Sequence, residues 1–207
     1  MLLFCIRHGE TEFNAAGRIQ GQLDSPLSEL GYRQCAAAAD ALVSVPIDAV
    51  YSSPLLRASE SARIIAERLK VEVRFDDRLK EINAGVFQGR CWAEIDEVYP
   101  DEAKRWRTQD PDFCIPEGES RRLLMTRAFA ALSDIKAAGH QQVVVVAHGG
   151  SLSAAFKALL EIPAERNPFS LQNGSITRIA WGDGGVKMLS LNQIDHLHDL
   201  ARGGGEL

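Results

Sequence analysis

The sequence has few cysteines and no long apolar run. Its 4 cysteines, at positions 5, 35, 91 and 114, are scattered and form no C-x-x-C pair, which favours free thiols in a reducing cytoplasm over a disulfide framework. No stretch approaches the ~18 apolar residues that a membrane-spanning helix needs. The short apolar run at residues 2–6 has no basic segment before it. We therefore expect no signal peptide, no membrane partner and a cytoplasmic location.

A surplus of positive charge is also missing. The 23 Lys and Arg residues are outnumbered by 28 Asp and Glu, which gives a net charge of −5. Nucleic acid is therefore not expected as a partner, because nothing is in excess to neutralise its phosphates. A small, locally positive pocket for a small anion is still compatible with this balance. The length of 207 residues suits a single domain over residues 1–207, acting as a monomer or a homodimer.

Several well-known catalytic motifs are absent. The sequence contains no G-x-x-x-x-G-K-[ST] segment, so a P-loop is not predicted. No cysteine is followed six positions later by arginine, which excludes a cysteine-phosphatase loop. The segment Gly149-Gly150-Ser151-Leu152-Ser153 lacks the final glycine of a G-x-S-x-G nucleophile elbow. Any phosphate or ester chemistry must therefore use other groups.

Short apolar runs alternate with helical patterns along the chain, which predicts an α/β fold: a three-layer αβα sandwich with a mostly parallel central sheet. Two polar or irregular stretches interrupt the alternation. The first is a loop at residues 9–27, and the second, at 82–117, is expected to hold short helices and to form a cap or lid. Residues 202–207 are glycine-rich and predict a flexible tail. The predicted strands are 2–6, 47–51, 71–75, 143–147, 175–181 and 186–191, and the predicted helices are 28–43, 54–69, 119–138 and 151–161.

Two of the expected strands end in a histidine followed by glycine. Residues 2–6 run into Arg7-His8-Gly9, and residues 143–147 run into His148-Gly149. Gly9 is expected to let the backbone turn sharply, because it has no Cβ atom to clash. Two strands with the same ending predict a site that contains two histidines.

A second arginine and a carboxylate are expected at the same edge of the sheet. Serine is a good N-cap and proline is favoured at the first helical position, so Ser53 and Pro54 predict a helix that begins at Pro54. Arg57 then lies in its first turn, where it reinforces the preference of a helix N-terminus for anions. Glu81 follows the strand at 71–75 by a few residues. Ligands of α/β sheets bind beyond the carboxyl ends of the strands, so we expect these groups to meet.

Two arginines and two histidines would form a pocket for a compact, doubly charged anion. Phosphate is the obvious candidate, because guanidinium groups bind its oxygens in pairs. A neutral imidazole can attack phosphorus and form a phosphohistidine, provided that one ring nitrogen is held as a donor and the other is left free. The remaining cations would stabilise charge on the transferring phosphoryl group. A carboxylic acid such as Glu81 could protonate the leaving alkoxide and later activate water.

Four segments of the chain, taken together, resemble a known family. They resemble, in family order and from about residue 3 to 198, the histidine phosphatase superfamily of phosphoglycerate-mutase-like proteins. One departure is Gln88, where many phosphatase members carry glutamate. The four segments are Arg7-His8-Gly9-Glu10-Thr11 with Asn14, residues 52–62, Leu79-Lys80-Glu81 followed by Gly85 and Gly89, and Ala147-His148-Gly149-Gly150.

This resemblance implies a role for each matching residue. It implies His8 as the phosphorylated nucleophile and Glu81 as the proton donor, acting on a small phosphorylated metabolite with no metal or organic cofactor. The phosphate and substrate ligands implied by the resemblance are Arg7, Arg57, His148, Gly149, Asn14, Gln20 and Gly21.

Three functions are compatible with these residues. The first is a metal-independent phosphomonoesterase that works through a phosphohistidine. The second is a cofactor-dependent phosphoglycerate mutase. Such mutases usually carry an insertion after the acid/base segment, whereas here only the short stretch 90–118 follows Gly89. The third is a non-catalytic phospho-ligand-binding module, which should lack the nucleophile or the acid. The pair His196 and His198 has a spacing seen in metal sites, but two histidines alone are no ligand set.

Overall fold

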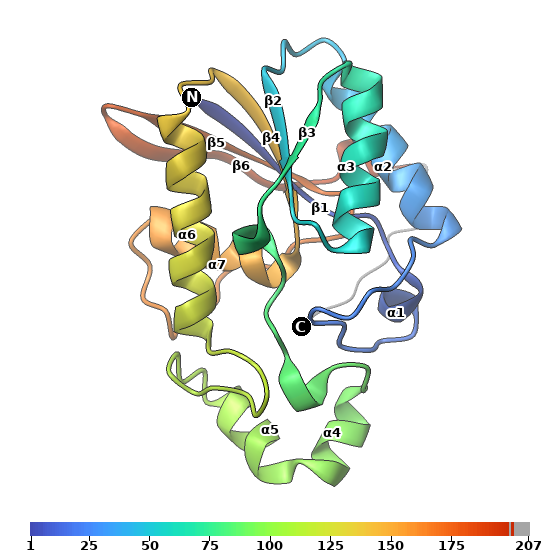
Figure 1. Cartoon of the computed structure of the whole chain (residues 1–207), viewed down its shortest axis with the longest axis vertical. Helices are drawn as coiled ribbons and strands as arrows, with labels where there is room; N and C mark the ends of the chain where they lie inside the picture. The colour runs from blue at the N-terminus through green and yellow to red at the C-terminus, as the bar shows by residue number, and fades with distance from the viewer. Residues whose placement is uncertain (199, 201–207) are drawn as a thin grey trace.

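The computed structural model describes residues 1–198 and 200, so the predicted tail at 202–207 lies outside the described residues. The described chain forms six strands with helices between most of them (Figure 1). In chain order they are β1 (Leu2–Arg7), α1 (Glu12–Ala15), α2 (Glu29–Leu42), β2 (Ala49–Ser52), α3 (Leu56–Leu69), β3 (Val73–Phe75), η1 (Asp77–Leu79), η2 (Gly85–Phe87), α4 (Trp92–Val98), α5 (Pro100–Arg107), α6 (Arg121–Ala137), β4 (Gln142–Ala147), α7 (Gly149–Leu159), β5 (Ile176–Gly182), β6 (Gly185–Gln193) and η3 (Asp195–Leu197).

The strands form one 6-stranded sheet in the order β3-β2-β4-β1-β5-β6. The first four strands of this order are parallel to one another. Strand β5 runs antiparallel to β1, and β6 runs antiparallel to β5. In the β1–β4 pair, Arg7 lies opposite Ala147. The register therefore places His8 and His148 directly after two paired residues at the same edge of the sheet.

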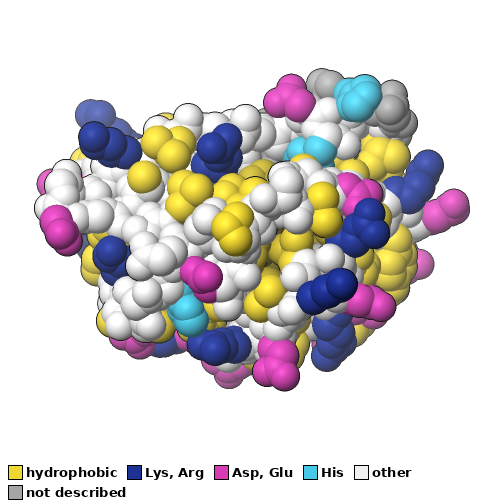
Figure 2. Space-filling model, turned by 90° about the horizontal axis from the view of Figure 1, so that it is seen from above, with side chains coloured by type: hydrophobic (Ala, Val, Ile, Leu, Met, Phe, Trp, Pro, Cys, Tyr) yellow, Lys and Arg dark blue, Asp and Glu magenta, His cyan; other side chains and the backbone are white. Residues whose placement is uncertain are grey.

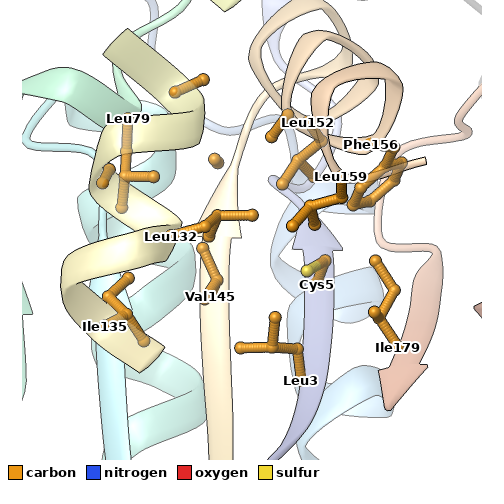
Figure 3. Packing of buried hydrophobic residues seen from close by; sticks show 14 of the residues in the cluster. Leu3, Cys5, Leu79, Leu132, Ile135, Val145, Leu152, Phe156, Leu159 and Ile179 are labelled. Carbon is orange, nitrogen blue, oxygen red and sulfur yellow. The ribbon is translucent and has the colours of Figure 1, made fainter. Parts of the chain in front are cut away.

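Helices cover both faces of this sheet, so the predicted three-layer α/β fold is confirmed (Figure 1). Side chains of β1 alternate between the two faces: Leu3 and Cys5 pack on the face covered by α6 and α7, and Phe4 and Ile6 on the face covered by α2 and α3. Figure 3 shows the first of these layers, with Leu3 and Cys5 beside side chains of both helices. This two-sided burial fixes the register and with it the position of the residues that follow each strand.

The start of α3 differs from the prediction. The helix begins at Leu56 and not at Pro54, and its N-cap residue Leu55 makes no side-chain capping bond. The hydroxyl of Ser53 instead accepts a hydrogen bond from the backbone N–H of Leu55 at 3.3 Å, which closes a short turn ahead of the helix. Arg57 still lies in the first turn, as predicted.

The loop predicted at residues 9–27 contains a short helix, α1, that the prediction missed. Its N-cap Thr11 and its third residue Asn14 form a reciprocal capping box: the Asn14 N–H donates to Thr11 Oγ1 at 3.1 Å, and the Thr11 N–H donates to Asn14 Oδ1 at 3.2 Å. A threonine followed three residues later by a polar side chain is the signal that could have revealed it.

Glycine is needed at position 9 for a reason other than the predicted sharp turn. A Cβ atom there would lie 2.4 Å from the carbonyl oxygen of Gly31 on α2, so glycine allows the two backbones to approach each other.

Residues 82–117 hold η2, α4 and α5, which lie beyond the carboxyl ends of the parallel strands (Figure 1). These elements have their own apolar cluster, which includes Phe87, Ile95, Ala103 and Phe113 and reaches α7 at Ala154. The opposite end of the molecule, seen from above in Figure 2, has acidic and basic side chains mixed over its surface. None of the helices in the described part of the chain is both long and apolar enough to cross a membrane.

Candidate active site

The imidazole rings of His8 and His148 lie side by side at the edge where β1 and β4 end. Their centroids are 5.1 Å apart and the rings are tilted by 59°. Both side chains are buried, with 2% and 0% of their surface exposed. The two-histidine cluster that the repeated His-Gly ending predicted is therefore present in the structure.

Hydrogen bonds hold the His8 ring in one tautomer. Its Nδ1 lies 2.7 Å from the carbonyl oxygen of Gly9, which can only accept, so Nδ1 carries the proton. The other nitrogen, Nε2, accepts a hydrogen bond from Nε of Arg57 at 3.3 Å. The lone pair on Nε2 is thus directed toward a guanidinium group, which is the place where an anion would bind.

Both histidines are kept neutral by their surroundings. Burial lowers the pKa of His8 well below its usual 6.5, and the positive charges of Arg57 and Arg7 lower it further. Burial also lowers the pKa of His148 well below 6.5, followed by the charge of Arg57. A neutral His8 with an unprotonated Nε2 is the form that can act as a nucleophile.

Arg57 is clamped between the first turn of α3 and the loop after α1. Its Nη1 donates to the carbonyl oxygen of Leu23 at 2.9 Å, and its Nη2 donates to that of Gly21 at 2.7 Å. The side chain is 1% exposed, and this burial lowers the pKa of Arg57 to about 10, which still leaves it charged at neutral pH. Gly21 thus contributes its carbonyl group to the position of Arg57.

The second arginine of the site, Arg7, is the last residue of β1. Its Nη1 donates to the carbonyl oxygen of Leu171 at 2.5 Å. Burial lowers the pKa of Arg7, and the nearby carboxylate of Glu81 partly opposes this shift. Arg7 lines two adjoining cavities described below, the smaller of them together with His8.

The carboxylate of Glu81 is held by two backbone N–H groups. Oε1 accepts from the N–H of Ile82 at 2.8 Å, and Oε2 accepts from the N–H of Gly150 in the first turn of α7 at 2.9 Å. A Cβ atom at position 150 would lie 2.4 Å from Oε1. Glycine at this position is therefore what allows the carboxylate to approach the helix.

Arg127 on α6 fixes the backbone that carries Glu81. Its guanidinium donates to the carbonyl oxygens of Arg78, Lys80 and Glu81 at 2.7, 2.5 and 2.8 Å. It also forms an ion pair with the carboxylate of Glu119 at 2.5 Å. No sequence pattern indicates this contact, because Arg127 resembles any other polar residue on an amphipathic helix.

Two further residues of the site were missed by the sequence analysis. The hydroxyl of Ser53, predicted to be a helix cap, lies 2.8 Å from Nε2 of His148. The side-chain N–H of Asn173 donates to the carbonyl oxygen of His8 at 3.0 Å and to Oδ1 of Asn14 at 3.3 Å. Asn173 lies in an irregular stretch before β5, where no motif distinguishes it.

The remaining predicted ligands lie at the same pocket. Asn14, Gln20 and Gly21 line a small cavity together with His8 and Arg57, and Gly149 begins α7 beside Arg7. Gln88, the departure from the family pattern, accepts a hydrogen bond from the backbone N–H of Gln22 at 2.7 Å. Gln22 in turn donates its side-chain amide to the carbonyl oxygen of Glu81 at 3.0 Å, which links Gln88 to the loop that carries the carboxylate.

The two histidines near the end of β6 contact backbone carbonyl groups. Nε2 of His196 lies 2.9 Å from the carbonyl oxygen of Gly174, and Nδ1 of His198 lies 2.7 Å from that of Asp195. Gly174 itself donates its N–H to the carbonyl oxygens of Arg7 and His8. His196 therefore supports the backbone behind the site. Across residues 1–198 and 200, no group of three or more His, Cys, Asp or Glu is arranged to hold a metal ion.

Two adjoining cavities open at this site. The smaller, of about 60 Å³, is lined by Arg7, His8, Arg57 and Glu81, which is enough room for a compact anion. The larger, of about 320 Å³, shares Arg7, Ile19 and Trp92 with the first. Its wall combines apolar and aromatic side chains from η2, α4, α5 and the loop before β5 with polar and charged side chains from α6 and α7. A narrow cationic pocket thus leads into a wider one of mixed polarity.

The fold is a mostly parallel α/β sheet whose strand ends carry a buried histidine pair beside Arg57 and Arg7. Residues 3–194 match the sequence model of the histidine phosphatase superfamily (branch 1). The chain therefore belongs to this family.

Similar proteins include both phosphatases and probable mutases. The chain is 36% identical to the probable phosphoglycerate mutase GpmB of Proteus mirabilis, with 96% of each protein covered. It is 31% identical to the putative phosphoserine phosphatase 2 of Hydrogenobacter thermophilus, covering 96% of this chain and 98% of that protein. The structure of a mycobacterial glucosyl-3-phosphoglycerate phosphatase in complex with VO3 is 36% identical, with a TM-score of 0.83 over 92% of this chain and 98% of that chain.

Proposed function

We propose that the protein is a metal-independent phosphomonoesterase that hydrolyses a small phosphorylated metabolite through a phosphohistidine at His8. The observation that carries this proposal is the tautomer of His8: the Gly9 carbonyl takes the proton of Nδ1, so Nε2 is left unprotonated inside a cationic pocket. That arrangement supplies a nucleophile and the positive charge that a transferring phosphoryl group requires.

In the first step, Nε2 of His8 attacks phosphorus while the bond from phosphorus to the ester oxygen breaks. Arg7, Arg57 and His148 surround the position that the phosphoryl oxygens would occupy. In the free protein, Nε of Arg57 donates a hydrogen bond to Nε2 of His8, the atom that must attack phosphorus. When the phosphate binds, the guanidinium group must therefore donate to the phosphate oxygens instead. Glu81 gives its proton to the leaving alkoxide, which departs as an alcohol.

In the second step, water attacks the phosphohistidine. Glu81, now a carboxylate, takes a proton from this water as its oxygen bonds to phosphorus. The bond from phosphorus to Nε2 breaks, and inorganic phosphate leaves with His8 restored. The backbone N–H groups of Ile82 and Gly150 hold the carboxylate in place for both steps.

The names of the relatives support hydrolysis of phosphomonoesters. One relative is a putative phosphoserine phosphatase, and a structure with 36% identity is that of a glucosyl-3-phosphoglycerate phosphatase. The test is a panel of metabolite phosphomonoesters with free phosphate as the readout. Release of phosphate by the wild type and its loss in His8→Ala is the expected result; no release from any ester would favour the non-catalytic binding module.

A mutase is the second candidate, because the relative with 36% identity over nearly its whole length is a probable phosphoglycerate mutase. In a mutase, the phosphohistidine passes its phosphoryl group to a second hydroxyl and not to water. Incubation with 3-phosphoglycerate and its bisphosphate primer distinguishes the two. We expect slow release of phosphate; rapid isomerisation with little free phosphate would contradict the phosphatase proposal.

A further inference from the structure

The larger cavity contains two cationic side chains, Arg121 and Lys157, that the proposed reaction does not use. Lys157 is 5% exposed and Arg121 is partly buried. Neither takes part in an ion pair with any carboxylate of the described residues. The negative charges of Asp110 and Glu165 act on Arg121 and Lys157, respectively, but from beyond ion-pair distance. Buried charges are normally paired, so two cations that share a cavity without a carboxylate in direct contact are suited to an anion from outside the chain.

The guanidinium of Arg121 is held in place but keeps donors available. It lies over the Trp106 ring, 3.2 Å from the ring centre, and its Nη2 donates to the carbonyl oxygen of Trp106 at 3.0 Å. Its Nη1 is buried and has no hydrogen-bond partner among residues 1–198 and 200. Burial lowers the pKa of Arg121 to about 10. A rigid, charged group with a buried unused donor is suited to bind an anion.

Lys157 adds a second positive charge beside the first. Its Nζ donates to the carbonyl oxygen of Ala164 at 2.9 Å, which uses one of the three donors of an ammonium group. Burial lowers the pKa of Lys157, and the charge of Arg121 lowers it further. An anion between the two side chains would relieve this repulsion and satisfy donors of both.

The position of this pair relative to the phosphate pocket follows from α7. Gly150, Ser153, Ala154 and Lys157 all line the larger cavity, and their spacing is that of one helix face. Gly150 binds the carboxylate of Glu81 at the reacting end. Lys157 comes seven residues later, which is about 10 Å along a helix that rises 1.5 Å per residue. The backbone of Lys157 therefore lies farther along α7 from the Glu81 contact than that of Gly150 does.

Part of the wall of the larger cavity is apolar and aromatic, and polar side chains such as Ser153 and Asn167 line the rest. Phe87, Trp92 and Ile115 line it on the side of residues 82–117, and Phe169 lines it on the other side. A volume of about 320 Å³ is at the lower end of the range for small-molecule sites. It can hold a flat or apolar connecting group that is much larger than the backbone of phosphoserine.

We propose that the substrate is a phosphomonoester whose leaving alcohol carries a second anionic group, bound by Arg121 and Lys157 in the larger cavity beside the phosphate pocket. This inference rests on the proposed phosphomonoesterase function and adds the substrate class to it. Arg121 and Lys157 act as specificity residues, and the reaction at His8 itself does not require them.

The test compares pairs of substrates that differ only in the distal charge. We would measure kcat/KM for para-carboxymethyl, para-carboxyethyl and para-carboxypropyl phenyl phosphate and for the primary amide of each. The alkyl spacer insulates the phenol from the carboxylate, so the acid and the amide have similar leaving groups. We expect the wild type to prefer the acid by about tenfold or more at the best spacer length, as one charge-assisted hydrogen bond would give.

Substitutions then identify the residues that cause the preference for the acid over the amide. Arg121→Gln and Lys157→Met should each bring the acid-to-amide ratio close to one. Arg122→Gln is the matched control, because Arg122 is the next residue but is exposed and pairs with Asp112; it should keep the wild-type ratio. Each ratio is taken on one preparation, so a variant that folds only in part still gives a valid value.

Two outcomes would overturn the inference: an acid-to-amide ratio near one at all three spacer lengths in the wild type, or an unchanged ratio in Arg121→Gln. Hydrolysis of plain phenyl phosphate separates this failure from that of the proposed function, since it reports the chemistry at His8 alone. If no ester is hydrolysed, calorimetric binding of the product hydroxyphenylpropionate and its amide decides the inference without turnover. Equal or absent binding of the acid relative to the amide counts against it.

Discussion

The hydroxyl of Ser53 lies 2.8 Å from Nε2 of His148, and this bond joins two residues that are 95 positions apart in the chain. Ser53 follows β2 and His148 follows β4, and these strands are parallel neighbours in the sheet. The strand pairing therefore brings the hydroxyl to the ring. The bond helps to orient the imidazole ring of His148. The function of His148 therefore depends on Ser53, which lies in neither of the two His-Gly segments.

Ser53→Ala should lower kcat by about tenfold, because one hydrogen bond that orients His148 is lost. KM should change less, since Arg7 and Arg57 still bind the phosphate. Steady-state kinetics with a single phosphomonoester measure both values. Ser133→Ala is the control, because its hydroxyl bonds only to a carbonyl oxygen of its own helix. A wild-type kcat in Ser53→Ala would show that the bond has no role in turnover.

Gly150→Ala should move the carboxylate of Glu81, because the new Cβ atom would lie 2.4 Å from Oε1. We expect a loss of about 1–3 kcal/mol in the free energy of unfolding, as in other over-packed sites. Activity should fall most for alkyl phosphates, whose leaving groups need a proton. The same measurements on Gly184→Ala give the background, because a Cβ atom there meets nothing within 4 Å. An equal loss for alkyl and activated aryl phosphates would contradict the proton-donor role of Glu81.

Arg57→Lys should lower kcat/KM by about a hundredfold, the usual effect of losing a donor that stabilises the transition state. Lysine keeps the charge but cannot donate at once to Gly21, Leu23 and the substrate, as the guanidinium fork does. Arg68→Lys on the same helix is the matched control, since Arg68 is exposed and pairs with Asp40. Activity near that of the wild type in Arg57→Lys would mean that charge alone suffices.

The free energy of unfolding should decrease as the pH falls below about 6.5 in phosphate-free buffer. The pKa values of His8 and His148 in the folded protein lie well below 6.5, whereas both protonate near 6.5 in the unfolded chain. The unfolded state therefore binds more protons in this window, and stability rises with pH until about 6.5.

Urea unfolding at a series of pH values measures this dependence. The double variant with His8→Asn and His148→Asn should lose much of it. Burial also lowers the pKa of His196, so this histidine contributes to the pH dependence as well. The variant His196→Gln measures the size of that separate contribution. Stability that is constant or higher below pH 6.5 in the wild type would contradict the neutral histidine pair.

The sheet and the central residues of the site could be predicted because their signals are local. Strands β1 and β4 are buried on both faces of the sheet. Each therefore appears in the sequence as a continuous apolar run that is followed by a histidine. Arg57 was placed correctly because three residues after a Ser-Pro pair lie in a first helical turn even when the start of the helix is misplaced.

The parts that could not be predicted depend on contacts between distant segments. Arg127 reaches the carbonyl oxygen of Glu81 across 46 positions, and Asn173 reaches that of His8 across 165. The larger cavity likewise exists only because residues 82–117 pack against α6 and α7. Such contacts leave no pattern in the sequence, so the specificity of the site appears only in the folded protein.

The most direct measurement of the central claim is the site of phosphorylation during turnover. The protein is mixed with a radiolabelled phosphomonoester, quenched rapidly under alkaline conditions that preserve phosphohistidine, and digested for peptide mapping. We predict acid-labile label on the N-terminal peptide that contains His8, and none in His8→Ala. Label on another residue, or turnover in His8→Ala at the wild-type rate, would contradict the account.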